Sequence, residues 1–343
     1  MIEFASFKTQ LAASAPRLFE LINGFKQSKV LVVGDLTLDE FLTGEVERIS
    51  REAPVLIIRH ETTRQTPGGG ANAVYNFAKL GAEVKVAGFL SKDPQGQVLR
   101  RMFEEVGIDT SAIVIDPDRP TVTKSRIAGH ARQSVTQQIV RIDRKSDELP
   151  DRDKQLELAA QIQQHLGQVD AVVCSDYGDG VFTPPVIEAV LSHDRTIVDT
   201  QKNLERYHGA RVFTPNLPEA ERAVGYGIKS FEDLLRAGRD LLALTQGEEI
   251  LITRGEQGMS LFARDGKVEH IPAFNRTDVF DVTGAGDTVV AALTLSLCLG
   301  ASYWEAAVLG NLAASIVVRQ FGTATTSQDE MKEALQGLLE VEA

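Results

Sequence analysis

The chain has 343 residues, of which 43% are hydrophobic and 24% are charged, as expected for a globular protein with one large domain. Its formal net charge of −12 argues against a general nucleic-acid-binding protein, because such proteins need a basic surface to neutralise phosphates. Cys174 and Cys298 form neither a disulfide framework nor a metal-binding pair, which fits a reduced, cytoplasmic environment. The apolar runs are too short for a membrane span, and we expect no membrane anchor.

The first residues have an amphipathic pattern that predicts a helical extension over 1–28, with the helix ending near Gly24. Over residues 29–343, short apolar runs alternate with segments of helical periodicity. The pattern predicts buried strands at 29–34, 84–89, 170–175, 196–199, 212–214 and 250–253, and helices at 71–80, 95–106, 152–166 and 230–244. This alternation is typical of an α/β fold with a mostly parallel sheet.

Asp35 and Asp39 follow the first predicted strand in the segment GDLTLDEF. Open α/β sheets bind ligands outside the carboxyl ends of their strands, so these two acids are candidates for binding sugar hydroxyls. A solvated loop is the alternative interpretation.

Two polar, strand-like segments, 45–66 and 121–143, interrupt the α/β alternation. They predict a small β-sheet that projects from the main domain and acts as a lid over a bound ligand. Long surface hairpins without a function explain the same pattern about as well.

A glycine cluster occupies PGGGANAVYNFAKLG, in which Gly68, Gly70 and Ala73 formally match the dinucleotide fingerprint G-x-G-x-x-A. That fingerprint should follow the first buried strand directly, whereas here a long polar segment intervenes. A loop of Gly68, Gly69 and Gly70 that lets a polyol approach the backbone, with Asn72 bonding a hydroxyl, fits better. A tight turn into a helix is the alternative.

Asn216 and Glu219 stand three residues apart in TPNLPEAE, after another predicted strand. The spacing suits a helix cap, and it also suits two members of a magnesium–phosphate site.

The segment DVTGAGDTVVAAL runs from small residues into an apolar helix. Gly284, Ala285 and Gly286 can present backbone N–H groups to an oxyanion at the helix start. Asp287 lies in the first turn, where a carboxylate suits a general base that takes the proton of an attacking hydroxyl. The alternative is that Asp287 only stabilises the helix dipole.

The motifs G-D-x-x-L-D, P-G-G-x-A-N, T-P-N-x-x-E, T-R-G-x-x-G-M and D-x-T-G-A-G-D occur in this order. With them, the chain from about Lys29 to Glu330 resembles the ribokinase-like (PfkB) carbohydrate kinase family. The segments SDYGDG, RYHGARVFTPNLPE and ITRGEQGMSLF look most like the kinase part of ADP-heptose synthases, which phosphorylates heptose 7-phosphate at its anomeric hydroxyl. The resemblance implies a three-layer α/β/α fold with a small β lid, and ATP and Mg²⁺ as cofactors.

The resemblance also implies a role for each matching residue. Asp287 would be the catalytic base and Gly284 to Gly286 the anion hole. The acceptor would be held by Asp35, Asp39, Gly68, Gly69, Gly70 and Asn72. Magnesium and the triphosphate would be organised by Asn216 and Glu219, with the metal bound through water. The nucleotide would lie against Thr253, Arg254, Gly255 and Gly258, with Asn311 on the adenine side. Asp281 and Thr283 lie where relatives bind a monovalent cation, which implies K⁺.

Two departures from heptose kinases concern the acceptor. This chain has Asp179 where they usually have lysine, and DTQKN where they usually read D-P-K-G. A phosphorylated acceptor needs cations, and the candidates to supply them are Arg126, Arg141, Arg144 and Lys202.

The sequence therefore predicts an ATP-dependent kinase for a small-molecule sugar or sugar phosphate, with Arg141 among the acceptor-binding residues and no nucleic acid or membrane as partner. We expect a homodimer formed through exposed lid strands. The alternatives are a kinase for a non-phosphorylated sugar or nucleoside, a nicotinamide-dependent oxidoreductase, and a non-catalytic sugar-binding regulator.

Overall fold

A nine-stranded sheet forms the centre of the molecule in the computed structural model, which describes residues 2–131, 135–275, 279–320 and 322–340. The strands are β1 (Lys29–Gly34), β4 (Glu83–Leu90), β5 (Asp109–Ile115), β8 (Ala171–Asp176), β9 (Thr196–Thr200), β10 (Val212–Phe213), β11 (Glu249–Thr253), β12 (Met259–Ala263) and β13 (Val268–Ile271). Their order is β13-β12-β11-β10-β9-β8-β1-β4-β5. Neighbours from β5 to β11 pair in parallel, and β12 and β13 are antiparallel additions.

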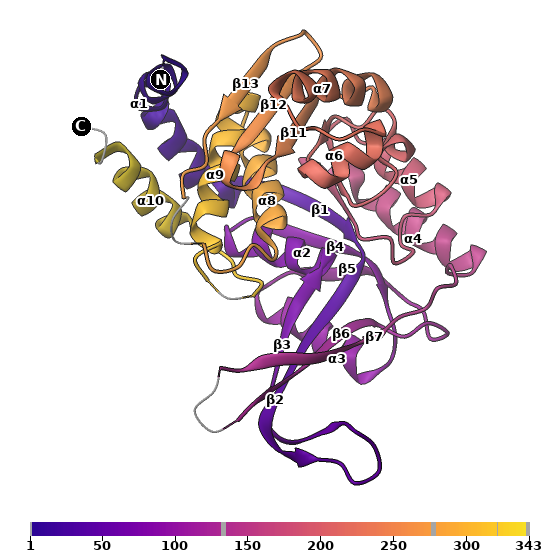
Figure 1. The fold of residues 1–343 in the computed structure, drawn as a ribbon. Coiled ribbons are helices and arrows are strands. Elements are labelled where there is room, and N and C mark those ends of the chain that lie inside the picture. The colour runs from indigo at the N-terminus through magenta and orange to yellow at the C-terminus, as the bar shows by residue number, and fades with distance from the viewer. Residues whose placement is uncertain (1, 132–134, 276–278, 321, 341–343) are drawn as a thin grey trace.

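Helices cover both faces of this sheet, which produces the three layers (Figure 1). One face packs against α1 (Ile2–Gly24), α2 (Gly70–Lys79), α3 (Pro94–Glu105), α8 (Ala285–Cys298), α9 (Tyr303–Val317) and α10 (Gln328–Glu340). The other packs against α4 (Arg152–His165), α5 (Pro184–Leu191), α6 (Leu217–Val224) and α7 (Phe231–Thr245). Along β1, Val30 and Val32 enter the first core, and Leu31 and Val33 enter the second. A strand buried on both faces has to be apolar throughout, which explains the unbroken runs in the sequence.

A second, four-stranded sheet projects from the main domain and is called the lid here (Figure 1). Its strands are β2 (Leu36–Ile49), β3 (Leu56–Gly69), β6 (Val122–His130) and β7 (Gln137–Arg144), in the order β3-β2-β6-β7. A single residue, Asp35, separates β1 from β2, and β3 passes directly into α2.

The lid strands are interrupted by bulges. The pairing of β2 with β3 shifts between Thr43 and Gly44, and the pairing of β6 with β7 shifts between Ile127 and Ala128. Thr43 lies opposite Ala128 across the β2–β6 pair, so the two irregularities lie side by side. Bulges bend strands locally, and these two lie along one line across the lid.

The expected strands and helices of the central domain are confirmed, with their ends shifted by at most one residue. The alternative interpretation of GDLTLDEF as a solvated loop is wrong. This segment forms the start of β2, because its backbone pairs with β3 on one side and β6 on the other. The lid therefore begins at residue 36 rather than 45. The sequence pattern also missed β5, β12 and β13.

The first helix is integrated into the main core. Leu11, Leu18, Leu21 and Ile22 of α1 are buried in the same cluster as α9 and α10. Among the described helices, none is long and apolar enough to cross a membrane.

Gly238 provides a test of the packing of α7 on the sheet. A Cβ at this position would overlap the ring of Phe262 on β12. We expect Gly238→Ala to lower the free energy of unfolding by roughly 1–2 kcal/mol, because overpacking outweighs the gain in helix propensity. Gly337→Ala in α10 is the matched control, since a Cβ there has no neighbour within 4 Å, and it should be neutral or stabilising. Urea unfolding measures both, and equal stability of the two variants would contradict this packing.

Candidate active site

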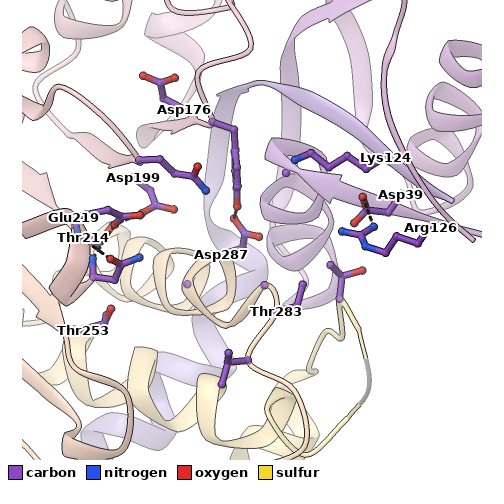
Figure 2. Close-up of a pocket in the computed structure, with 18 residues that line it drawn as sticks. Asp39, Lys124, Arg126, Asp176, Asp199, Thr214, Glu219, Thr253, Thr283 and Asp287 are labelled. Atoms are coloured by element: carbon purple, nitrogen blue, oxygen red, sulfur yellow. Dashed lines mark hydrogen bonds and ion pairs between the residues drawn. The ribbon is translucent and has the colours of Figure 1, made fainter. Parts of the chain in front are cut away.

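A cavity of about 340 Å³ lies between the lid, the carboxyl ends of the central strands and the start of α8. Figure 2 shows Asp287 near its middle, with Asp39, Lys124 and Arg126 on the lid side. Asp199, Thr214 and Glu219 line the opposite side. The cavity thus has two ends of different chemistry, with one carboxylate between them.

Asp287 occupies the first turn of α8 and is buried. The Asn72 side-chain amide donates a hydrogen bond to its Oδ2 at 2.7 Å, and the Tyr177 hydroxyl donates to its Oδ1 at 3.1 Å. Burial raises the pKa of Asp287 to about 6, while the two hydrogen bonds and the charge of Lys124 oppose the rise. A carboxylate with this pKa is ionised at neutral pH and remains basic enough to accept a proton.

The turn that precedes Asp287 depends on Gly284. Its φ is 78°, in the left-handed region, and a Cβ there would lie 2.6 Å from the Asn72 amide nitrogen. Gly284 caps α8, and Ala285 and Gly286 are its first residues, where backbone N–H groups have no partner within the helix; the Ala285 N–H donates to the Val282 carbonyl before the helix at 3.2 Å. The expected anion hole and the expected base therefore lie at one helix start.

Asp35 does not lie on the cavity wall. It is buried, and its carboxylate accepts hydrogen bonds from the backbone N–H groups of Tyr177 at 2.8 Å, Asp179 at 3.1 Å and Val181 at 3.1 Å. Burial raises its pKa to about 7, with a further rise from the neighbouring Asp176. The geometry assigns Asp35 to holding the loop that carries Tyr177, rather than to the acceptor contact expected from the sequence.

The glycine cluster joins β3 to α2. A Cβ at Gly68 would lie 2.6 Å from the Asp39 carboxyl carbon, so this glycine lets Asp39 lie against β3. Gly69 lines the cavity, and the Gly70 N–H donates to the Asp35 carbonyl at 2.9 Å. The Asn72 amide N–H donates to Asp287, and the expected bond from Asn72 to a sugar hydroxyl stays a prediction.

Among the four expected cations, Arg126 lines the cavity. Arg141 lies opposite Arg126 on the neighbouring strand and forms an exposed ion pair with Asp143. Arg144 is on the opposite face of the lid, where it pairs with Glu40 at 3.3 Å.

Asp179 and Lys202, from the two departures from heptose kinases, do not line the cavity, whereas Gln201 of the segment DTQKN does. Lys202 lines a neighbouring cavity. Asp179 forms an ion pair with Lys145 at 3.5 Å, which offsets its negative charge.

Asn216 and Glu219 form the capping box of α6. Asn216 Oδ1 accepts from the Glu219 N–H at 2.9 Å, and Glu219 Oε2 accepts from the Asn216 N–H at 2.8 Å. The capping interpretation is therefore confirmed. Both residues also line the cavity, where burial raises the pKa of Glu219.

Asp199 lies beside this cap and accepts a hydrogen bond from the Thr214 hydroxyl at 3.1 Å. Burial raises its pKa well above the usual range, and the charges of Asp287 and Glu219 raise it further. Excess buried negative charge of this kind suits a hard divalent cation with oxygen ligands. Within the described residues, no group of three or more His, Cys, Asp or Glu side chains is placed to hold a metal ion.

A second cavity, of about 600 Å³, adjoins the first and shares Asn216, Thr253, Val282 and Gly286 with it. The residues expected at a nucleotide site line it together: Thr253, Arg254, Gly255, Gly258 and Asn311. Apolar side chains complete the wall: Met259, Phe274, Val289 and Val318. This lining can hold a flat apolar group whose polar chain extends toward Gly286.

Asp281 ties the loop before α8 to the segment after α9. Its Oδ1 accepts from the Thr283 N–H at 2.9 Å and the Thr283 hydroxyl at 2.7 Å, and its Oδ2 accepts from the Gly322 N–H at 2.9 Å. A monovalent cation at Asp281 and Thr283 stays a prediction.

The sequence analysis missed several residues of the cavity, among them Lys124, Tyr177 and Asp199. Tyr177 and Asp199 lie at the carboxyl ends of β8 and β9, the position at which such sheets bind ligands. That signal was present in the sequence. Lys124 stands within a lid strand, and nothing in its local sequence distinguishes it from a solvated lysine.

Comparison with known proteins identifies similar chains. The chain is 42% identical over 318 residues to the Bifunctional protein HldE of Desulfatibacillum aliphaticivorans, covering 91% of this chain and 64% of that protein. It is 42% identical over 307 residues to the protein of the same name from Geobacter metallireducens, covering 88% and 61%. The chain thus spans less than two thirds of the length of these relatives.

Solved structures share the fold at low sequence identity. Arabidopsis thaliana ribokinase complexed with ribose and ATP matches with a TM-score of 0.69 and 21% identity, covering 91% of this chain and 99% of that one. Escherichia coli phosphofructokinase-2 in complex with potassium matches with a TM-score of 0.73 and 18% identity, covering 91% and 99%. The fold is therefore ribokinase-like. A sequence model described as pfkB family carbohydrate kinase matches residues 27–330, and the chain belongs to this family.

Proposed function

We propose that this pfkB-family sugar kinase transfers the γ-phosphoryl group of ATP to a hydroxyl of a sugar phosphate, with heptose 7-phosphate, at its anomeric hydroxyl, as the acceptor. The observation that carries the proposal is the place of Asp287. It lies between a cavity end that contains Lys124 and Arg126 and a second cavity suited to a nucleotide.

The chemistry follows from the position of Asp287 at the start of α8. The acceptor hydroxyl gives its proton to the Asp287 carboxylate as its oxygen attacks the γ-phosphorus. The bond from that phosphorus to the β–γ bridging oxygen breaks, and the electron pair leaves with ADP. Backbone N–H groups of Gly284 to Gly286 stabilise the charge on the transferring group. Magnesium would be organised by Glu219 and Asn216 and would neutralise phosphate charge.

A phosphorylated acceptor is supported by the charge on the lid. Lys124 and Arg126 line the acceptor end of the cavity, and Arg141 lies next to Arg126 in the sheet. A guanidinium binds phosphate with two parallel hydrogen bonds, which a neutral sugar does not need.

Two further assignments belong to the same proposal. Asp281 and Thr283 would contribute to a K⁺ site beside the anion hole, supported by their shared hydrogen bonds at that loop. The protein would dimerise through the lid, since β7 is an edge strand whose residues are all exposed, including Ile139, Val140 and Ile142.

ADP release from a panel of sugars and their phosphates tests the acceptor. We expect turnover of heptose 7-phosphate with a kcat/KM well above that of unphosphorylated heptose, because the lid cations bind the phosphate. Turnover of unphosphorylated sugars alone would overturn the acceptor assignment and leave the kinase assignment intact. ATP binding without turnover of any sugar would favour a non-catalytic regulator.

Asp287→Asn tests the base. Turnover should fall by roughly 10²-fold or more, the loss expected for a positioned base, while nucleotide affinity stays within a few fold. In the wild type, kcat/KM should decline as pH falls through about 6, because the protonated carboxyl accepts no proton. Tyr177→Phe removes a hydrogen bond that stabilises the ionised form, so it should move this decline to higher pH. Near-normal turnover of Asp287→Asn would return Asp287 to a helix-dipole role.

Glu219→Gln separates the metal role from the cap. Glutamine still accepts the Asn216 N–H, so the melting temperature should change little, whereas the Mg²⁺ concentration for half-maximal rate should rise several-fold. Glu305→Gln is the matched control, since Glu305 holds the equivalent position in the exposed Ser302 capping box of α9. An unchanged Mg²⁺ requirement in Glu219→Gln would limit Glu219 to capping.

A further inference from the structure

The inner face of the lid is the face whose Asp39, Lys124 and Arg126 line the cavity. Two rows of side chains cross the four strands on this face. Cross-strand pairing sets both rows. The first row is Thr66, Asp39, Lys124 and Asp143, and the second is Arg64, Phe41, Arg126 and Arg141. Asp39 and Arg126 are thus diagonal neighbours on adjacent strands.

Arg126 and Asp39 form an ion pair inside the cavity, with 2.9 Å between Arg126 Nη1 and Asp39 Oδ1 (Figure 2). The Asp39 side chain is 6% exposed and that of Arg126 is 21% exposed, so the pair is largely shielded from water. The two atoms are buried, and in the described part of the chain neither makes a well-directed hydrogen bond. The pair is held by charge, so each of the two side chains can form a better-directed hydrogen bond with another partner.

The two side chains of this pair differ in how firmly each is held in place. Gly68 lets Asp39 lie close against β3, and this packing fixes the carboxylate. The Arg126 guanidinium lies over the ring of Phe41, with Cζ 5.2 Å from the ring centroid. A cation–π contact of this kind keeps the guanidinium in place without a carboxylate. Arg126 can therefore leave Asp39 and remain in the cavity.

Lys124 has a different position. Its ammonium lies over the Tyr177 ring, 5.6 Å from the centroid, and its charge acts on Asp287. Lys124 therefore lies at the acceptor end on the side of the Asp287 base. Arg126 is the cation that forms the ion pair with Asp39, the expected acceptor-binding carboxylate.

We propose that Arg126 masks Asp39 in the free enzyme and is drawn off by the phosphate of the acceptor, so that Arg126 sets the preference for phosphorylated over unphosphorylated sugars. This inference rests on the proposed sugar-phosphate acceptor. A neutral sugar has only hydroxyls with which to separate a shielded ion pair, and it leaves the guanidinium without an anion. A phosphate replaces the carboxylate charge for charge, and the released Asp39 accepts a hydrogen bond from a sugar hydroxyl.

Arg126→Gln tests the inference in the full-length enzyme, with heptose 7-phosphate and heptose as probes. We expect kcat/KM for heptose 7-phosphate to fall by roughly 10²-fold, as for loss of one partner of a buried charge pair. The kcat/KM for heptose should rise, because Asp39 is no longer masked. Arg126→Lys, which keeps the charge but not the two-pronged geometry, should give an intermediate ratio.

Arg144→Gln is the matched control, since Arg144 pairs with Glu40 on the outer face of the same sheet. It should leave the ratio of the two kcat/KM values within about twofold, as for a partly exposed pair. The gain for heptose in Arg126→Gln should disappear when Asp39→Asn is added, because the gain depends on the freed carboxylate.

A fall of both kcat/KM values by the same factor in Arg126→Gln, or an unchanged ratio, would overturn the masking role. The wild-type ratio tests a separate point. If the wild type uses no phosphorylated sugar, the proposed function itself fails, whatever the variants do.

Discussion

The arrangement of the candidate active site depends on one buried carboxylate, Asp287, that is kept ionised. Asp287 loses hydration in the first turn of α8, and hydrogen bonds from Asn72 and Tyr177 replace part of that water. Each donor is held in turn by another part of the chain. Asn72 lies on α2 directly after the glycine cluster, and Tyr177 lies on a loop fastened by Asp35.

The need to hold the two donors to Asp287 also explains the positions of residues that look unrelated in the sequence. Gly284 adopts a positive φ and leaves room for the Asn72 amide. Asp35 is buried because it accepts three backbone N–H groups, and the loop that it holds brings the Tyr177 ring to the cavity. Removing Asp35 would therefore disturb the base from a distance, without any contact between the two carboxylates.

Much of the fold could be predicted from the sequence, because strands covered on both faces must be apolar and short. The start of β2 could not, since its inner face carries Asp39 and its residues alternate in polarity as a surface loop also can. Asp35 and Asp39 look equivalent in GDLTLDEF, yet Asp35 fastens a loop and Asp39 faces the cavity. The contacts of Asp287 with Asn72 and Tyr177 span 215 and 110 positions along the chain, and no local pattern reveals them.

The line of bulges across the lid divides that sheet mechanically. On the side nearer the core, Asp39 lies on β2, which only Asp35 separates from β1, and Lys124 and Arg126 lie on β6, which pairs with β2. Beyond the line, Gly44 and Gly129 stand opposite each other, and the strands carry on to exposed tips. Bending is easiest at such irregularities. The two parts of the lid therefore differ in stiffness: the side chains that face the cavity stand on the part that is paired close to the central sheet, and bending is concentrated in the part that does not line the cavity.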